Sequence, residues 1–175
     1  DGRFGYIELM NGGNDGASFL NMLNYVKDKK TLDHFNDETI IYFLEDDYLH
    51  ASGWETVLLE VFEYLNVDYV TLYDHFDKYF LPMYETLQSS IYVTPSCHWR
   101  TTPSTTNTYA CKAKTLIKDF EIHRKFCDLE KGYTRDHDKF THLWQNGSNL
   151  ISSIPGYVTH VETQYLSPVV DWSKI

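Results

Sequence analysis

The feature that most constrains the fold is an apolar run that ends in three acids. Ile40–Leu44 reads Ile-Ile-Tyr-Phe-Leu, and Glu45-Asp46-Asp47 follows it at once. A continuous apolar run of this length is typical of a central strand that is covered on both faces. Three adjacent carboxylates repel one another unless a cation or hydrogen bonds offset their charge. The sequence therefore predicts a buried strand that carries an acidic cluster to one edge of a sheet.

The acidic triplet has two interpretations. Carboxylate oxygens are the ligands that Mg²⁺ and Mn²⁺ prefer, and such sites often share the metal with substrate phosphates. The alternative is a solvated acidic turn that leads into the next helix, which we expect to start near Ser52 with Ser52 and Glu55 as a capping box. The residues alone leave both interpretations open.

Strand and helix patterns alternate along most of the chain and predict an α/β sandwich with a mostly parallel central sheet, built as a single domain over residues 1–175. Ligands of such sheets sit beyond the carboxyl ends of the strands. That rule predicts a common rim for Asn11–Gly16, Glu45–Asp47 and Asp74–Tyr79. The expected strands are Tyr6–Met10, Ile40–Leu44, Asp68–Tyr73, Ser90–Val93, Thr105–Cys111 and Leu150–Ile154, and the expected helices lie after Asn11–Gly16, after Ser52, and at Thr115–Cys127 and Asp138–Gln145.

Composition excludes some functions. The formal net charge is −10, whereas a broad nucleic-acid footprint needs a basic face. A small anionic ligand remains compatible if a divalent cation reverses the local sign of charge. Three cysteines without a CxxC motif indicate free thiols in a reducing compartment, and we find neither a membrane-spanning run nor a signal peptide. We therefore expect a cytoplasmic protein that binds no nucleic acid and spans no membrane.

Polar, aromatic and cationic residues are dense in Asp74–Tyr79 and His98–Arg100. Lys78 and Arg100 are candidates to contact a phosphate group. Alternatively, these residues fasten a long loop, and the sequence does not separate the two readings. The rings that could stack on a sugar face are Phe76, Tyr79 and Trp99.

Three later segments carry further candidates. Asp136 and Asp138 precede a predicted helix, where a carboxylate acts either as a helix cap or as a general base. His160 could complete a metal shell, although a lone histidine is more often an ordinary hydrogen-bonding residue. Ser104–Thr108 offers small hydroxyl side chains that could line a polar pocket, but the default expectation is the exposed face of a strand.

Taken in order, these pieces resemble the GT-A glycosyltransferases, in particular family 2. The strand that ends in Glu45-Asp46-Asp47 resembles their DXD-type motif. Asp136, followed by Phe140, Leu143 and Gly147, resembles the motif that carries the catalytic Asp of inverting members, and His160 stands where many members place a late metal ligand. The resemblance extends from about Tyr6 to His160.

The resemblance implies a GT-A-like, Rossmann-like α/β/α sandwich and transfer of a sugar from a nucleotide-diphosphate sugar to the hydroxyl of a glycan or other acceptor, with inversion. It implies that Mn²⁺ or Mg²⁺ is held by Asp47 and His160, while Glu45 or Asp46 contacts the ribose or a metal-bound water. Asn11 and Gly13 become candidates for donor contact. Asp136 becomes the base.

Two departures qualify this pattern. Arg135 replaces the usual Glu before the base, which leaves Asp138 as a rival base. We expect that the usual first β-α unit of the family is absent before Asp1, so that either the chain has been trimmed or the donor site is built differently. Two other classes use similar residues: a metal-dependent phosphohydrolase or nucleotidyltransferase, and a non-catalytic module that binds sugar nucleotides.

Overall fold

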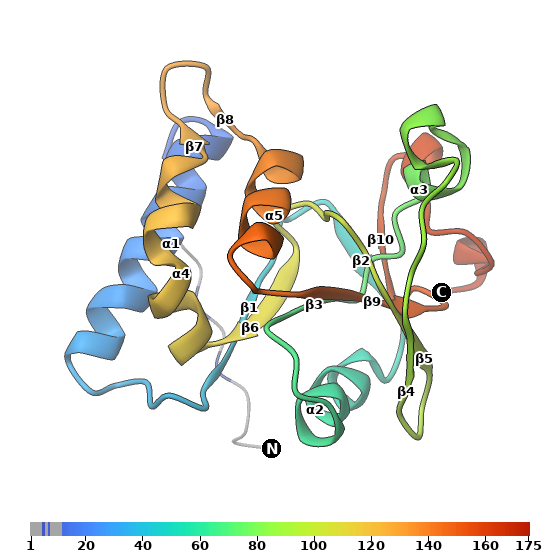
Figure 1. The fold of residues 1–175 in the computed structure, drawn as a ribbon, viewed down its shortest axis with the longest axis horizontal. Coiled ribbons are helices and arrows are strands. Elements are labelled where there is room, and N and C mark those ends of the chain that lie inside the picture. The colour runs from blue at the N-terminus through green and yellow to red at the C-terminus, as the bar shows by residue number, and fades with distance from the viewer. Residues whose placement is uncertain (1–4, 6, 8–11) are drawn as a thin grey trace.

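The computed structural model describes Gly5, Ile7 and residues 12–175, and it has a mixed α/β architecture. A six-stranded sheet carries helices on both faces, and two further sheets have two strands each (Figure 1). The elements are α1 (Asp15–Thr31), β1 (Ile40–Phe43), β2 (Tyr48–His50), α2 (Trp54–Tyr64), β3 (Tyr69–Thr71), α3 (Asp77–Phe80), η1 (Pro82–Tyr84), β4 (Ile91–Val93), β5 (His98–Thr101), β6 (Tyr109–Lys112), α4 (Ala113–Lys125), β7 (Cys127–Asp128), β8 (Tyr133–Thr134), α5 (Asp136–Gln145), β9 (Leu150–Ile154), β10 (Val158–His160), η2 (Thr163–Tyr165) and η3 (Trp172–Lys174).

The order of the large sheet is β1-β6-β3-β9-β5-β4. Among the described residues, only β3 and β9 pair in parallel, and the other neighbours are antiparallel. The prediction of a mostly parallel sheet is therefore wrong for this part of the chain. β1 and β3, which α2 links along the chain, point the same way, but β6 inserts between the two strands in the opposite direction. The β4–β5 hairpin adds another antiparallel pair.

Three strands nevertheless point the same way. β1 and β3 are both antiparallel to β6, and β9 is parallel to β3. Their carboxyl ends therefore meet at one edge of the sheet, where Glu45–Asp47 follows β1 and Asp74–Tyr79 follows β3. The expectation of a shared rim holds for these two segments. The candidate Asn11 lies outside the described residues, and so does the expected strand at Tyr6–Met10 except for Ile7.

Each face of the sheet buries its own core cluster, because alternate strand residues point to opposite faces. In β6, Tyr109 and Cys111 face α1, α4 and α5, whereas Ala110 faces α2. The cluster under α2 includes Val57, Leu58, Val61 and Phe62 from the predicted helical stripe. The cluster under the other three helices includes Phe19, Leu23, Val26, Leu116, Phe120, Phe140 and Leu143.

The apolar run Ile40–Leu44 does not form a central strand. β1 lies at the edge of the sheet within the described residues, and it is only half-buried except for Phe43. Its apolar character has another cause: Ile41 and Phe43 pack into one core cluster, whereas Ile40 and Tyr42 pack against the other. A strand that contacts both cores needs apolar residues on both faces, wherever it stands in the sheet.

The starts of α1 and α2 differ in their caps. Asn14 caps α1, since its side-chain oxygen accepts the Ala17 N–H at 2.9 Å. The predicted capping box at Ser52 and Glu55 does not form. Gly53, with a φ of 84°, is the residue before the first turn of α2, so Ser52 lies one position too early to cap it.

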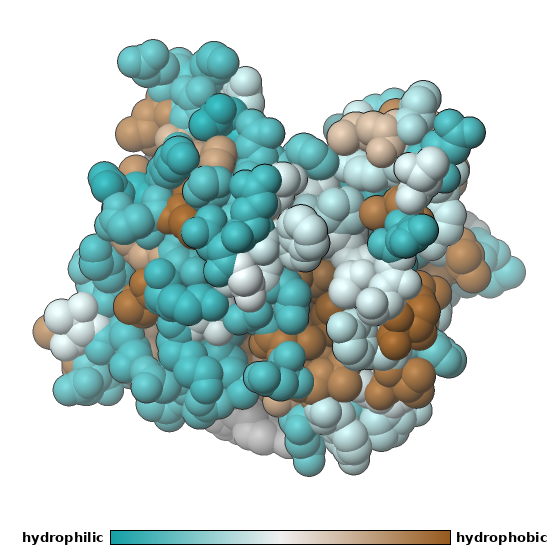
Figure 2. Space-filling model, viewed as in Figure 1, coloured by the Kyte–Doolittle hydropathy of each residue, from teal (hydrophilic) through white to brown (hydrophobic). Residues whose placement is uncertain are grey.

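The surface is mostly polar over α1 and α4, and apolar residues gather near β4 and β5 (Figure 2). Ile91 and Val93 on β4 are both more than half exposed. The three cysteines are free and buried, in agreement with the sequence-based expectation of unpaired thiols. Within the described residues, no helix has the length and apolar character needed to cross a membrane.

Candidate functional site

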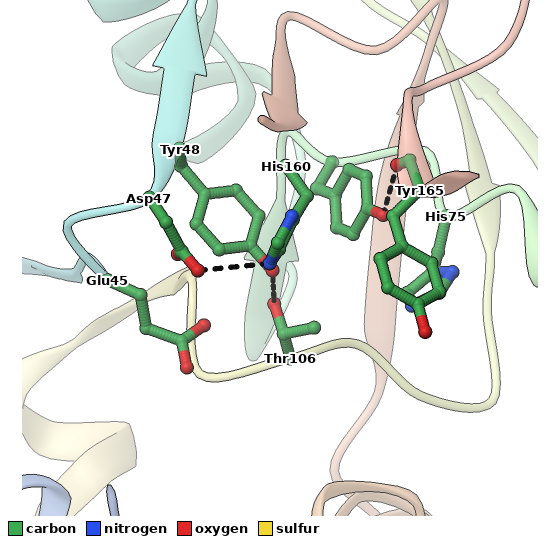
Figure 3. Close-up of a pocket in the computed structure, with 8 residues that line it drawn as sticks. Glu45, Asp47, Tyr48, His75, Thr106, His160 and Tyr165 are labelled. Atoms are coloured by element: carbon green, nitrogen blue, oxygen red, sulfur yellow. Dashed lines mark hydrogen bonds and ion pairs between the residues drawn. The ribbon is translucent and has the colours of Figure 1, made fainter. Parts of the chain in front are cut away.

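A pocket of about 320 Å³ opens where the segments after β1 and β3 meet the β2–β10 pair. It contains two of the predicted acids and the predicted late histidine, brought together from distant parts of the chain. Aromatic rings form much of its wall (Figure 3). Its lining residues are Glu45, Asp47, Tyr48, Tyr73, His75, Thr106, His160 and Tyr165.

Asp47 and His160 meet because β2 and β10 pair in antiparallel register. Tyr48 stands opposite His160, and the Val161 N–H donates to the Asp47 carbonyl at 3.0 Å. This pairing places the His160 Nε2 atom 3.0 Å from the Asp47 Oδ2 atom, as the dashed line in Figure 3 marks. The His160 side chain is 17% exposed, so its ring is both anchored and reachable from the pocket.

The spacing of these two donor atoms suits a shared metal. Ligands on adjacent corners of an octahedron, each about 2.1 Å from Mg²⁺, lie about 3.0 Å apart. Among the described residues, no third acid, histidine or cysteine completes a ready-made ligand group. A metal held here would therefore draw its remaining ligands from water and substrate phosphates, as Mg²⁺ sites commonly do.

The proton on His160 also bears on this fit. The Glu162 N–H donates to the His160 Nδ1 atom at 3.1 Å, so without a metal the proton of the neutral ring is on Nε2 and points at Asp47. Coordination through Nε2 requires that proton to leave or to move to Nδ1, with a small shift of the Glu162 amide.

Glu45 is the most electrostatically perturbed acid of the pocket. Its backbone N–H donates to the Thr108 hydroxyl, which also lies 3.2 Å from the Glu45 carboxylate. Burial, together with the neighbouring carboxylates of Asp136, Asp15 and Asp47, raises the pKa of Glu45 to about 7. This excess of negative charge is what a bound cation would relieve.

Asp136 lies next to this acidic group, in the first turn of α5. Its Oδ1 atom accepts hydrogen bonds from the Thr134 hydroxyl at 2.8 Å and from the Lys139 ammonium at 3.0 Å. Asp138 points elsewhere: its side chain is 55% exposed, and its nearest cationic partner is Arg135 at 3.7 Å. Of the two rival bases, the geometry favours Asp136, because only Asp136 is tied to the buried network beside Glu45.

The run Ser104–Thr108 forms part of this network. The default expectation of an exposed strand face is wrong, because this segment is a largely buried loop ahead of β6. Thr106 lines the pocket and accepts the Tyr48 hydroxyl at 2.9 Å. Asn107 is buried and accepts the Lys139 ammonium at 2.7 Å. The sequence also suggested that this run could line a polar pocket, and Thr106 does so.

The other candidates lie away from the pocket lining. The Lys78 ammonium bonds to both carboxylate oxygens of Asp77, at 2.8 and 3.0 Å. Arg100 pairs with the buried Asp74 at 2.6 Å, so both cations are already neutralised. Asp46 is exposed on the turn between β1 and β2, and Gly13 (φ 94°) lies in the turn before α1.

The aromatic rings that could meet a ligand are not those singled out from the sequence. Trp99 has no exposed surface and belongs to the core. The pocket wall is built instead from Tyr48, Tyr73 and Tyr165. His160 packs edge-on against Tyr48 and Tyr165, and His75 packs against Tyr73 with its ring tilted. Burial raises the pKa of the Tyr48 and Tyr73 hydroxyls, so both remain neutral. No sequence pattern marked these tyrosines, because they stand on separate segments: Tyr48 in β2, Tyr73 after β3 and Tyr165 in η2.

Comparison with known proteins adds no assignment: the chain matches no protein-family model and no curated protein sequence.

Proposed function

We propose that this chain is a metal-dependent glycosyltransferase that moves a sugar from a nucleotide-diphosphate donor to an acceptor hydroxyl. The observation that carries the proposal is the 3.0 Å contact between Asp47 and His160, two side chains from distant segments, at the edge of an acidic pocket. Aromatic walls support the choice of a sugar nucleotide, because such rings suit the faces of sugars and bases.

In this proposal, Asp47 and His160 hold Mn²⁺ or Mg²⁺. The bound metal would supply positive charge that stabilises the leaving diphosphate. Glu45 lies beside this position, where it can accept a hydrogen bond from a water or from a donor hydroxyl. Thr106 and Tyr48 keep the floor of the pocket fixed through their mutual hydrogen bond.

Asp136 is the proposed base. It would take the proton of the acceptor hydroxyl as that oxygen bonds to the anomeric carbon and the bond from this carbon to the diphosphate breaks. Thr134 and Lys139 hold its Oδ1 atom, which leaves Oδ2 without a hydrogen-bond partner among the described residues and available to the acceptor. Attack from the side opposite the leaving group would invert the anomeric centre.

Isothermal titration calorimetry with UDP-, GDP- and dTDP-sugars, with and without Mn²⁺, tests this proposal. We expect one donor family to bind, and to bind only with the metal. Release of free sugar or of inorganic phosphate, without transfer to an added glycan, would favour a hydrolase. Metal-dependent binding that survives Asp136→Asn, with no transfer by the parent chain under any acceptor condition, would favour a binding module.

A further inference from the structure

The pocket has few groups that could answer the negative charge of a diphosphate. Glu45 and Asp47 are acids, and no Lys or Arg is among its described lining residues. His160 directs its Nε2 atom toward Asp47. The remaining lining side chain that can carry positive charge is His75, which stands on the segment between β3 and α3.

His75 is held in place on several sides. Its Nδ1 atom lies 3.0 Å from the Asp77 carboxylate, and both side chains are 20% exposed. Its ring packs against Tyr73, with centroids 4.8 Å apart, and stands edge-on to Tyr165. Lys78 binds the same Asp77 carboxylate from the other side. The imidazole is therefore oriented by its surroundings rather than left to rotate.

The partners of His75 also indicate which ring nitrogen accepts a hydrogen bond. The Asp77 N–H is 3.3 Å from the Nδ1 atom and donates to it when that nitrogen is bare. With Nδ1 as the acceptor, the hydrogen of the neutral ring is on Nε2. Burial would raise the pKa of Asp77, but hydrogen bonds from His75 and Lys78 outweigh it and lower that pKa.

The second ring nitrogen is uncommitted. Within the described residues, the His75 Nε2 atom has no hydrogen-bond partner, and it is not a buried unsatisfied atom. An N–H at this position is a charge-assisted donor at the wall of the pocket, on a residue that also contacts Tyr165. This is the arrangement that an anionic ligand oxygen needs.

We propose that His75, oriented by Asp77, binds the diphosphate of the nucleotide-sugar donor through its Nε2–H. The inference rests on the proposed function and adds a contact that does not depend on the metal ligands. It also gives Lys78 a role that differs from direct phosphate contact, since Lys78 secures the acid that orients the histidine. After transfer, the same hydrogen bond would hold the departing nucleotide diphosphate.

Binding of the preformed Mn²⁺–pyrophosphate complex tests this contact by calorimetry on the whole chain. We expect His75→Gln to weaken binding by about tenfold or more, since a hydrogen bond to a charged group is lost. Asp77→Asn should weaken it less, because the ring remains. His98→Gln, at an exposed histidine outside the pocket, is the matched control and should bind like the parent chain. Binding of Mn²⁺ alone should be the same in all four proteins.

The outcomes separate the two proposals. If the parent chain binds the complex and His75→Gln binds it equally well, the histidine contact is wrong and the proposed function stands. If the parent chain does not bind it at all, both are overturned. A measurement on the parent chain covers the case of a poorly folded variant: the Nε2 resonance of His75 should shift when Mg²⁺–pyrophosphate is added, and that of His98 should not. An unmoved His75 resonance would refute the contact.

Discussion

Replacement of Lys139 by Met removes an ammonium group that has no exposed surface. The Nζ atom bonds to the Asn107 Oδ1 atom at 2.7 Å and to the Asp136 Oδ1 atom at 3.0 Å. It also lies over the rings of Phe19 and Phe140, at 4.6 and 5.1 Å from their centroids. Met has a similar length and fills nearly the same space, so the change isolates the charge and its hydrogen bonds.

We expect Lys139→Met to lower the free energy of unfolding by about 3 kcal/mol. Removal of one partner of a buried ion pair typically costs about 3–5 kcal/mol, because the other charge is left uncompensated. The lower end applies here, since the Asp136 side chain is 25% exposed and water can reach its carboxylate. The bare carbonyl oxygen of the buried Asn107 side chain adds to the cost.

Equilibrium urea unfolding, followed by tryptophan fluorescence, measures this loss. Lys118→Met is the matched control: its side chain is 53% exposed, and its bond to Ser148 is 2.9 Å long, so we expect a loss below about 1 kcal/mol. A loss for Lys139→Met no larger than that of the control would refute the argument. It would mean that the network around Asp136 does not depend on the lysine charge.

Three further predictions concern the metal, the base and pH. Mn²⁺ should raise the melting temperature of the parent chain and of Asp46→Asn, but not that of Asp47→Asn, because of these two acids only Asp47 lines the pocket. Equal shifts of the melting temperature in all three proteins would contradict Asp47 as the metal ligand. Asp136→Asn should still bind the donor in calorimetry, while the rate of sugar transfer to the acceptor falls at least 100-fold. Asp138→Asn should keep both donor binding and transfer. If Asp136→Asn still transfers the sugar, Asp136 is not the base. Burial lowers the pKa of His123 well below its ordinary value, so at low pH the unfolded chain binds a proton that the folded chain does not. The free energy of unfolding, measured by urea titration, should therefore fall as the pH falls below about 6.5, by up to ~1.4 kcal/mol per pH unit. If the free energy of unfolding of His123→Gln depends on pH in the same way, this origin is excluded.

Local patterns predicted the elements better than their arrangement. The stripe from Val57 to Phe62 forms α2, and Leu150–Ile154 forms β9 with the same bounds. Strand direction was predicted wrongly, because the insertion of β6 between β1 and β3 depends on pairing between segments far apart in the chain. No local pattern encodes that pairing. The prediction that Ile40–Leu44 forms a central strand was wrong for the same reason. Its apolar residues indicate that both faces of the strand are packed, but they do not indicate which strands pair with it.

The pocket was predictable where its residues follow strands that point the same way. Glu45–Asp47 and His75 follow β1 and β3, and the strand-end rule needs only the direction of those two strands. Thr106 and Tyr165 enter from an irregular loop and from a short 3₁₀ turn. Their side chains reach the pocket through tertiary contacts that leave no periodic trace. For Lys78 and Arg100, the structure favours the alternative interpretation that they fasten a loop over the one that they contact phosphate. Lys78 pairs with the adjacent Asp77, and Arg100 pairs with the buried Asp74.

The acids in and beside the pocket differ in how their charge is neutralised. Lys139 neutralises the charge of Asp136, which is the inner of these acids. Its ammonium group donates hydrogen bonds to Asp136 and Asn107. Glu45 and Asp47 face the pocket with no comparable cation among its described lining residues, and burial together with the neighbouring carboxylates raises the pKa of Glu45. The fold compensates the inner acid with a buried lysine, whereas the outer acids have no Lys or Arg beside them among the described lining residues of the pocket. That asymmetry argues for a cation-linked site more strongly than the acidic triplet does by itself.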